Sequence, residues 1–404
     1  HLRHRLTKLG LERVRRIFTW ENHIGNLIEL MQPLAEPKPL KLLINGLHAR
    51  TGGGVTYLRN MLPLMAMEPN VEVHLCIYDD QRDVIPVDLA KVTYHFLPYK
   101  RAFWSVLMRE QVEIPLLAWR LGVDTTFSPA NYGPFLAPGR VILVRNAVSV
   151  GFVEQRPLKL AYWAVLYVAT LLSLLTCRRA IAVSEYACYL GGGAVAARLR
   201  KRIRVVPHGV DKIYSQREVA NSRKSFLLSV SDIYVQKNFT NLIQALTKLK
   251  ERFPDIKLKI AGEPVDQDYY ETLKRLIEIE DLAEQIEFLG YVPPKALCKL
   301  YRACAVFVFP STVETFGNPL VEAMACGAPI ASSKSTAMPE VLGDAGLYFD
   351  PEDVDEIAAT IKSMLLDKKL CNTLSQKAEI RSKQFTWELT MEQTMTALRD
   401  RTPL

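Results

Sequence analysis

The chain has 404 residues, of which 49% are hydrophobic and 23% are charged, so it can form two ordinary domains with full cores and is not a disordered chain. Lys and Arg number 51 against 43 Asp and Glu. The resulting net charge of +8 suits phosphorylated ligands, anionic lipid or nucleic acid without choosing among them.

Residues 1–39 form a basic N-terminal extension in which arginines are interspersed with leucine, valine and isoleucine. The pattern fits a basic amphipathic helix that binds anionic lipid, and it fits a solvated helical extension equally well. Residues 1–20 lack the long apolar run of a complete secretory signal.

Residues 40–210 are expected to form a first Rossmann-like domain, which we assign to the acceptor. An apolar run at 41–44 leads through Asn45 into a glycine loop at 52–54 and then into a helical pattern, in the order strand, loop, helix. Strand patterns follow at 71–78, 92–97, 123–127, 141–144 and 180–183, and helical patterns at 103–121 and 158–177.

Residues 211–384 repeat this alternation, and we place the domain junction near Val210, before a polar stretch at 215–224. The strand patterns are short and almost continuously apolar, as parallel strands covered on both faces should be. We therefore expect an α/β protein with two Rossmann-like, doubly wound domains facing one another across a cleft. Ligands should bind beyond the carboxyl ends of the strands.

The segment between residues 309 and 330 is the most informative part of the sequence. A strand ends before it, Asn318 is expected to cap a helix that begins at Pro319, and Gly327 ends that helix. Glu314 then lies in the loop before the helix and Glu322 at the end of its first turn. A helix N-terminus attracts phosphate, and a carboxylate pair beside it suits a nucleotide sugar.

A simpler interpretation of the same spacing is that Glu322 complements the helix dipole and Glu314 lies on a solvated loop. The order Glu314, seven residues, Glu322, followed by Ala-Met-Ala-x-Gly-x-Pro, resembles the signature of glycosyltransferase family 4 (glycosyl transferases group 1). These are retaining enzymes of the GT-B fold. The resemblance extends over nearly the whole chain from about Leu40.

The resemblance implies a metal-independent, hexosyltransferase-type enzyme that needs no cofactor besides its substrate. It would move a sugar from a nucleotide-diphosphate sugar to an acceptor hydroxyl. By the family's pattern Glu314 holds sugar hydroxyls and Glu322 holds the ribose hydroxyls. The donor-binding residues that it implies are Gly53, Gly54, Gly262, Val292, Phe316, Gly317, Asn318, Leu320 and Glu322.

Lys237 lies in a segment, 228–238, that resembles the family's phosphate-binding segment, and is implied to neutralise the departing diphosphate. Many relatives also place Arg where this chain has Gln236 or Asp232, so Lys237 must do more of this work. Many relatives carry a His after the strand at 141–144, where this chain has Arg145 and Asn146. We expect one of these two to contact the donor sugar or stabilise developing charge.

Residues 385–404 resemble the start and course of the family's last helix, which crosses back to the first domain and couples closure to binding. His208 stands in the interdomain segment where the family usually has Asn. We expect it to be a linker residue rather than a catalytic base.

The apolar run at 160–177 is flanked by Lys159, Arg178 and Arg179, and its length of 18 residues is borderline for spanning a bilayer. A spanning helix would divide the first domain, so a buried or interfacial helix is expected. With the basic N-terminus, it suggests a first domain that rests on anionic lipid, although ordinary core-facing stripes explain it as well.

The lipid interpretation gives a peripheral protein at the inner face of the cell membrane and a glycan or lipid-linked acceptor, in polysaccharide or O-antigen assembly. Seven scattered cysteines without a C-x-x-C spacing fit a reducing cytosol and indicate no zinc site. A catalytically silent GT-B module that holds sugar nucleotide is the main alternative. Nucleic acid is not an expected partner, because no recognition-helix or stacked-aromatic pattern accompanies the charge.

Overall fold

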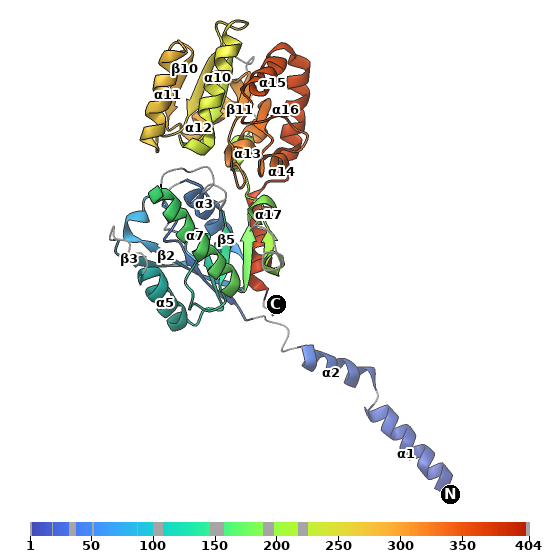
Figure 1. The fold of residues 1–404 in the computed structure, drawn as a ribbon. Coiled ribbons are helices and arrows are strands. Elements are labelled where there is room, and N and C mark those ends of the chain that lie inside the picture. The colour runs from blue at the N-terminus through green and yellow to red at the C-terminus, as the bar shows by residue number, and fades with distance from the viewer. Residues whose placement is uncertain are drawn as a thin grey trace.

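The computed structural model describes residues 2–17, 19–31, 38–50, 52–86, 88–99, 108–145, 157–188, 198–216 and 225–400. Two lobes lie one above the other, and two N-terminal helices project away from the lower lobe (Figure 1). These helices are α1 (Leu2–Ile17) and α2 (Trp20–Met31). None of the described helices qualifies as a membrane span.

The lower lobe contains a seven-stranded parallel sheet in the order β3-β2-β1-β4-β5-β6-β7. Its strands are β1 (Leu40–Asn45), β2 (Val71–Tyr78), β3 (Val92–Leu97), β4 (Thr125–Ser128), β5 (Val141–Val144), β6 (Arg179–Ala182) and β7 (Ile203–Val205). Its helices include α3 (Gly52–Met67), a π-helical turn (Arg109–Glu113) that continues into α5 (Ile114–Leu121), and α7 (Pro157–Thr176). The strand order reverses between β1 and β4, which places a ligand-binding edge at their carboxyl ends.

The upper lobe contains a six-stranded parallel sheet in the order β10-β9-β8-β11-β12-β13. Its strands are β8 (Phe226–Val230), β9 (Lys257–Ala261), β10 (Ile286–Gly290), β11 (Val306–Phe309), β12 (Ile330–Ser333) and β13 (Leu347–Phe349). Its helices are α9 (Lys212–Ser215), α10 (Phe239–Lys250), α11 (Gln267–Ile279), α12 (Pro294–Ala303), α13 (Asn318–Ala325), α14 (Met338–Leu342), α15 (Val354–Leu366) and α16 (Lys368–Ser382). Here the order reverses between β8 and β11.

Helix α10 illustrates how the sequence builds these layers. Its apolar residues recur three and four positions apart, and the buried ones are Phe239, Leu242, Ile243, Ala245, Leu246 and Leu249. This spacing forms one stripe along the helix, which packs on the sheet. Burying each large side chain stabilises the fold by roughly 1.5–3 kcal/mol.

The expected strands at 71–78, 92–97 and 141–144 coincide with β2, β3 and β5. The strand expected from Val123 begins later, at Thr125, because the Val123 amide donates to Ala118 O in the last turn of α5. Of the helix expected at 103–121, residues 103–107 lie outside the described residues. The remainder forms the π-helical turn and α5.

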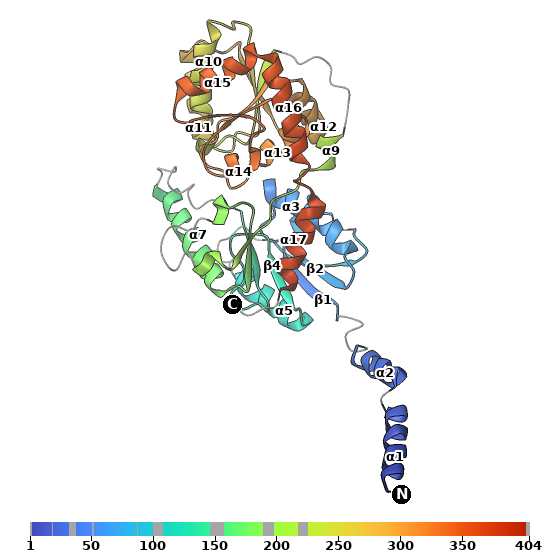
Figure 2. The ribbon, with the colours of Figure 1, turned by 90° about the vertical axis from the view of Figure 1, so that its right-hand side faces the viewer.

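Two chain segments cross between the lobes side by side. Val210 pairs with Thr386, and a Cβ at Gly209 would lie 2.2 Å from the Trp387 backbone nitrogen, so only glycine fits there. The second crossing leads into α17 (Trp387–Arg399), which lies along the lower lobe (Figure 2). Arg178 there donates to Leu398 O over 2.7 Å.

Candidate active site

The start of α13 is placed by Gly317, whose φ of 83° turns the chain into the helix. The prediction that Asn318 caps this helix is wrong: Gly317 occupies the cap, and Asn318 is the first helical residue. The Asn318 side chain contacts the interdomain segment instead, with its Oδ1 3.3 Å from His208 Nδ1. Glycine is required at the cap because few other residues adopt a positive φ.

Lys237 and Glu314, both predicted as catalytic, form one ion pair. Lys237 ends a 3-10 turn after β8, Glu314 lies in the loop after β11, and the Lys237 Nζ to Glu314 Oε1 distance is 2.5 Å. Both side chains are largely buried. The reversal of strand order between β8 and β11 therefore brings together two side chains that are 77 residues apart.

Neighbouring hydrogen bonds hold both loops of this pair. Asn238, with a φ of 56°, donates from Nδ2 to Pro310 O over 3.2 Å and to Pro351 O over 2.7 Å. The Thr312 amide donates to Gln236 O, and the Glu314 amide donates to Thr336 Oγ1. These hydrogen bonds thus fix both the loop that carries Lys237 and the loop that carries Glu314.

The same loop contacts the first domain directly. Thr315 Oγ1 donates to Arg145 O at the end of β5, and Ser184 Oγ, just after β6, donates to Thr315 O over 2.5 Å. Glu314 precedes Thr315 in the chain, so the ion pair lies at the interface between the two domains.

Arg145 stands at this interface beside the glycine loop. A Cβ on Gly54 would lie 3.1 Å from both terminal nitrogens of Arg145. Burial lowers the pKa of Arg145, and among the described residues its buried Nε has no hydrogen-bond partner. Arg145 therefore holds a buried donor at the interface that no described residue satisfies. Asn146, predicted together with it, lies outside the described residues.

Helices α3 and α13 begin close to one another across the interface. A Cβ on Gly53, in the first turn of α3, would lie 3.6 Å from Asn318 Nδ2 in the first turn of α13. The N-terminus of each helix carries a partial positive charge and unpaired N–H groups. Two such ends beside Arg145 and Lys237 favour an anionic ligand.

His208 packs as a neutral aromatic side chain in the same interface. Its ring centroid lies 5.4 Å from that of Tyr57, 5.5 Å from that of Phe316 and 5.7 Å from that of Trp387. Burial and the charge of Arg145 lower the pKa of His208 to about 3. His208 is thus uncharged at neutral pH, as a linker residue would be.

Glu322 lies among tyrosines rather than beside Glu314. Tyr301 of α12 donates to Glu322 Oε2 over 3.1 Å, and Tyr214 of α9 also hydrogen-bonds to this carboxyl group. Burial raises the pKa of Glu322 to about 7, against the effect of the tyrosine hydrogen bonds. A ligand group that donates to the carboxylate would restore its charge.

Gly262 and Val292, both predicted to bind the donor, lie on two turns that meet at the edge of the second sheet. The Gly262 amide donates to Gly290 O over 2.9 Å, and a Cβ on Gly262 would meet Ser231 O at 2.0 Å. Val292 is half-buried. Leu320 is fully buried, and its amide donates to Gly317 O.

Sequence reasoning missed the residues that join the two domains. Ser184 and Thr315 lie 131 positions apart, and nothing in the sequence near either residue shows that they meet. It also missed the pair of the partly exposed His48 and the buried Glu110, which lie 62 positions apart at the carboxyl edge of the first sheet. Only the topology brings such residues together.

The described part of the chain holds no group of three or more His, Cys, Asp or Glu residues arranged to bind a metal ion. In the acidic pairs at 266–268 and 353–355, the first aspartate caps the N-terminus of a helix. Asp266 accepts from the Tyr269 amide at the start of α11, and Asp353 accepts from the Glu356 amide at the start of α15.

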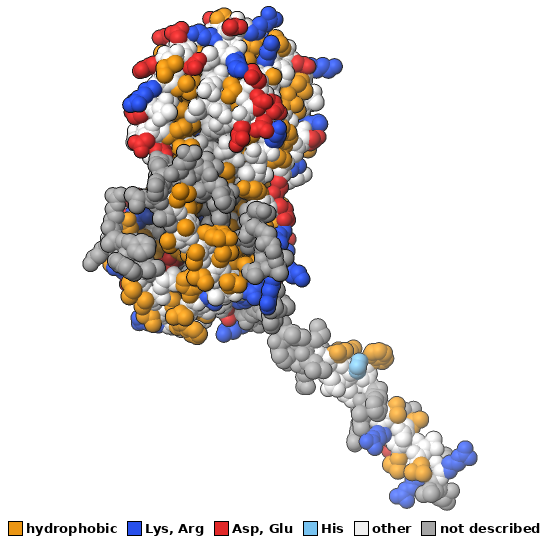
Figure 3. Space-filling model, in the orientation of Figure 1, with side chains coloured by type: hydrophobic (Ala, Val, Ile, Leu, Met, Phe, Trp, Pro, Cys, Tyr) orange, Lys and Arg blue, Asp and Glu red, His pale blue; other side chains and the backbone are white. Residues whose placement is uncertain are grey.

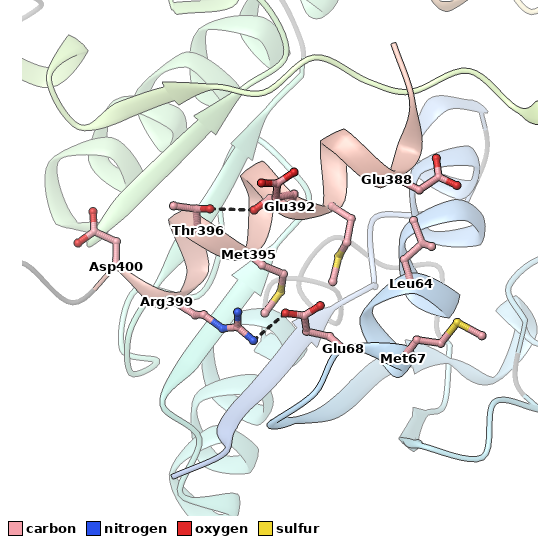
Figure 4. A pocket seen from close by; sticks show the side chains of 10 residues that line it. Leu64, Met67, Glu68, Glu388, Glu392, Met395, Thr396, Arg399 and Asp400 are labelled. Carbon is pink, nitrogen blue, oxygen red and sulfur yellow. Dashed lines mark hydrogen bonds and ion pairs between the residues drawn. The ribbon is translucent and has the colours of Figure 1, made fainter. Parts of the chain in front are cut away.

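A groove of about 650 Å³ lies away from these residues, between the end of α3 and α17 (Figure 4). Met391 and Met395 line its floor, and Arg399 forms an ion pair with Glu68 at one side. It is an open groove on the outer surface where α17 packs on the first domain, and it contains none of the predicted site residues.

Solved structures of other proteins share this fold of two facing domains. A HepE protein from Anabaena, solved with UDP and glucose, superposes with a TM-score of 0.69 at 17% identity, covering 89% of this chain and 99% of that one. The expected GT-B fold is thereby confirmed. Residues 210–381 match the family model of glycosyl transferases group 1.

Two curated relatives resemble this chain in amino-acid sequence. An O-antigen chain mannosyltransferase B from Escherichia coli is 38% identical over 178 residues, 43% of this chain and 45% of the relative. The chain thus spans less than half the length of that relative. A Campylobacter jejuni N-acetylgalactosaminyltransferase, named for a diphospho-undecaprenol-linked substrate, is 26% identical over 83% of this chain and 93% of its own length.

Proposed function

We propose that this protein is a glycosyltransferase that moves a sugar from a nucleotide-diphosphate sugar to a hydroxyl of a glycan or lipid-linked glycan. The observation that carries the proposal is the Lys237–Glu314 ion pair, held 2.5 Å apart at the domain interface beside the start of α13. The group 1 match over residues 210–381 and the O-antigen mannosyltransferase relative support the same reaction class.

In this proposal Glu314 binds the sugar hydroxyls, and Lys237 binds the diphosphate. The transition state is oxocarbenium-like and places new negative charge on the leaving diphosphate. Lys237, Arg145 and the amides of Gly317 and Asn318 are positioned to stabilise that charge, because preorganised donors lower the barrier when they face developing charge. Glu322 binds the ribose hydroxyls.

We propose transfer with retention and without a metal ion, as the family resemblance implies. The cationic groups already at the interface are Lys237, Arg145 and the first turns of α3 and α13. They could neutralise a diphosphate without a divalent cation. Chelation by EDTA should leave the rate unchanged, and proton NMR of the product should show the donor's anomeric configuration.

We further propose that the first domain binds anionic lipid at the inner face of the cell membrane. Helix α7 exposes Val165, Val168, Leu172 and Leu175 along one face, and Figure 3 shows apolar side chains gathered over this lobe. Residues 100–204 carry 15 Lys and Arg against 5 Asp and Glu. The substrate named for the Campylobacter jejuni relative is also lipid-linked.

The direct test is a thermal-shift screen with UDP, GDP, ADP and CDP, followed by turnover of the matching nucleotide sugars. A ligand that binds the native state raises the unfolding temperature according to its affinity. We expect one nucleotide to stabilise the protein and its sugar conjugate to be turned over. Stabilisation without turnover, with lipid-linked acceptor present, would favour the silent binding module.

A further inference from the structure

A second polar cluster lies at the carboxyl edge of the first sheet, outside the donor residues described above. Asn45 ends β1, and its Nδ2 donates to Glu110 Oε1 over 3.0 Å and to Ser128 Oγ, at the end of β4, over 3.3 Å. His48, three residues after β1, has its Nε2 2.8 Å from the same Glu110 oxygen. The cluster therefore joins β1, β4 and the π-helical turn where the strand order reverses.

The charge of this cluster is held away from water. Only 2% of the Glu110 side chain is exposed. A carboxylate in such a place is costly unless it is paired and hydrogen-bonded, and His48 and Asn45 supply the partners. Burial by itself lowers the pKa of His48, but the charge and hydrogen bond of Glu110 outweigh burial and Arg145, so the pKa is raised.

The loop on which His48 lies has a second anchor besides this cluster. The buried Gln81 provides it, because its Nε2 donates to Gly46 O over 3.0 Å and to Ala49 O over 2.8 Å. A purely structural role for the His48–Glu110 pair would duplicate this anchor.

His48 remains accessible at the carboxyl edge of the first sheet. Its side chain keeps 21% of its surface exposed, and its ring lies edge-on to Tyr132 at 5.0 Å. Its other ring nitrogen, Nδ1, has no hydrogen-bond partner within the described ranges. A Cβ on Gly54 would lie 3.3 Å from the Cα of Ala49, the residue after His48. The same Cβ would lie 3.1 Å from the two terminal nitrogens of Arg145.

We propose that His48, held by Glu110, binds a sugar hydroxyl of the glycan acceptor through Nδ1. The inference rests on the proposed function and names the first-domain side chain that contacts the acceptor, whereas Glu314, Lys237 and Glu322 of the second domain hold the donor. Glu110 is then a positioning residue that fixes the imidazole through Nε2. The charged groups that face His48 are Glu110 and Arg145.

The test compares His48→Ala and Glu110→Gln with wild type, using octyl glycosides of mannose, glucose and N-acetylgalactosamine as acceptors. His48→Ala should raise the acceptor KM about tenfold, the size of one hydrogen bond, and leave the donor KM unchanged. Glu110→Gln should move the pH dependence of the acceptor KM to lower pH, since Glu110 raises the pKa of His48. His95→Ala, in the His74–His95 contact between β2 and β3, is the matched control.

Each outcome is decisive. The inference would be overturned if His48→Ala left the acceptor KM unchanged, or raised the donor KM as much as the acceptor KM. In either case transfer by wild type would still support the proposed function. Donor hydrolysis by wild type without use of any glycoside would also overturn it. A wild type that turns over no nucleotide sugar would contradict the proposed function itself.

Discussion

In the function proposed above, the carboxyl group of Glu322 makes nucleotide binding depend on pH. Its pKa is raised to about 7 in the free protein by burial, so about half of the molecules carry it protonated at neutral pH. Ribose hydroxyls can donate to the carboxylate form with full strength. The free protein is thus held away from the form that binds best.

We predict that nucleotide affinity rises as the pH increases through about 7. Calorimetric titration should give tighter binding at about pH 8 than at about pH 6. Glu322→Gln should bind more weakly and lose this difference. Equal pH dependence in wild type and Glu322→Gln would exclude Glu322 as its source.

The same shift predicts a stability effect of opposite sign. The pKa of Glu322 is higher in the folded protein than in the unfolded chain, so its stabilising contribution is complete below the unfolded value of 4.5 and is lost as the pH rises through about 7. Without nucleotide, Glu322→Gln should therefore unfold at a higher temperature than wild type at about pH 8 and at a similar one at about pH 4. The control Glu278→Gln, on the exposed face of α11, should leave the unfolding temperature unchanged at both pH values.

At the scale of residues, the sequence predicted those that lie in one continuous segment. Glu314, Gly317 and Glu322 follow one another between a strand and a helix, so their chain neighbours reveal their setting. His48 and Glu110 could not be predicted, because nothing near either residue reveals the other. The cap at Gly317 was mispredicted because the Asn318 side chain contacts His208, which lies 110 positions earlier in the chain.

At the scale of elements, the paired crossing segments connect the two domains. The Thr390 hydroxyl donates to Pro207 O over 2.8 Å, and Gly209 lies against the backbone of Trp387. The two segments that connect the domains are therefore packed tightly against one another.

We predict that Gly209→Ala destabilises the protein by more than about 2 kcal/mol, because the added Cβ would meet backbone atoms that cannot move aside. Urea unfolding measures the change. Gly25→Ala is the control, since a Cβ there meets nothing within 4 Å. Equal stability of the two variants would show that the crossing segments are not tightly packed.

Strands were easier to predict than some helices. Helix α16 was missed because it buries only one large apolar residue, Leu374, beside the small or polar Cys371, Ser375, Ala378 and Ser382. Such a stripe gives little apolar periodicity in the sequence. The central strands, covered on both faces, are apolar at nearly every position and were predicted nearly to the residue.

At the scale of the whole molecule, charge and apolar exposure coincide on the first domain. The surplus of ten positive charges within residues 100–204 exceeds the net charge of the entire chain. Helix α7 in the same segment buries Leu174 and exposes Val168 and Leu172. Basic residues attract anionic lipid, and exposed apolar residues can enter the headgroup boundary.

We predict that the protein sediments with vesicles of phosphatidylglycerol and phosphatidylcholine but not with phosphatidylcholine alone, and that salt weakens the binding. The double variant Val168→Asp, Leu172→Asp should bind far less. Ile279→Asp and Leu366→Asp, exposed on the second domain, are the matched controls. Equal losses in both sets would refute a docking face on α7.

The two-domain architecture was predictable from the repeated alternation of strand and helix. The contacts between the domains were not, because Arg145, Ser184 and Thr315 meet only after both sheets have folded and stacked. The sequence could therefore indicate an interdomain site without showing which first-domain groups complete it.

The central claim is that Glu314 and Lys237 together act on the donor sugar nucleotide. Single-turnover transfer of a labelled sugar tests it most directly, with wild type, Glu314→Gln and Lys237→Gln compared at saturating donor. The account predicts that each substitution lowers the transfer rate at least about a hundredfold, as loss of a preorganised charge does, while the folded state persists. Transfer at the wild-type rate by either variant would contradict it.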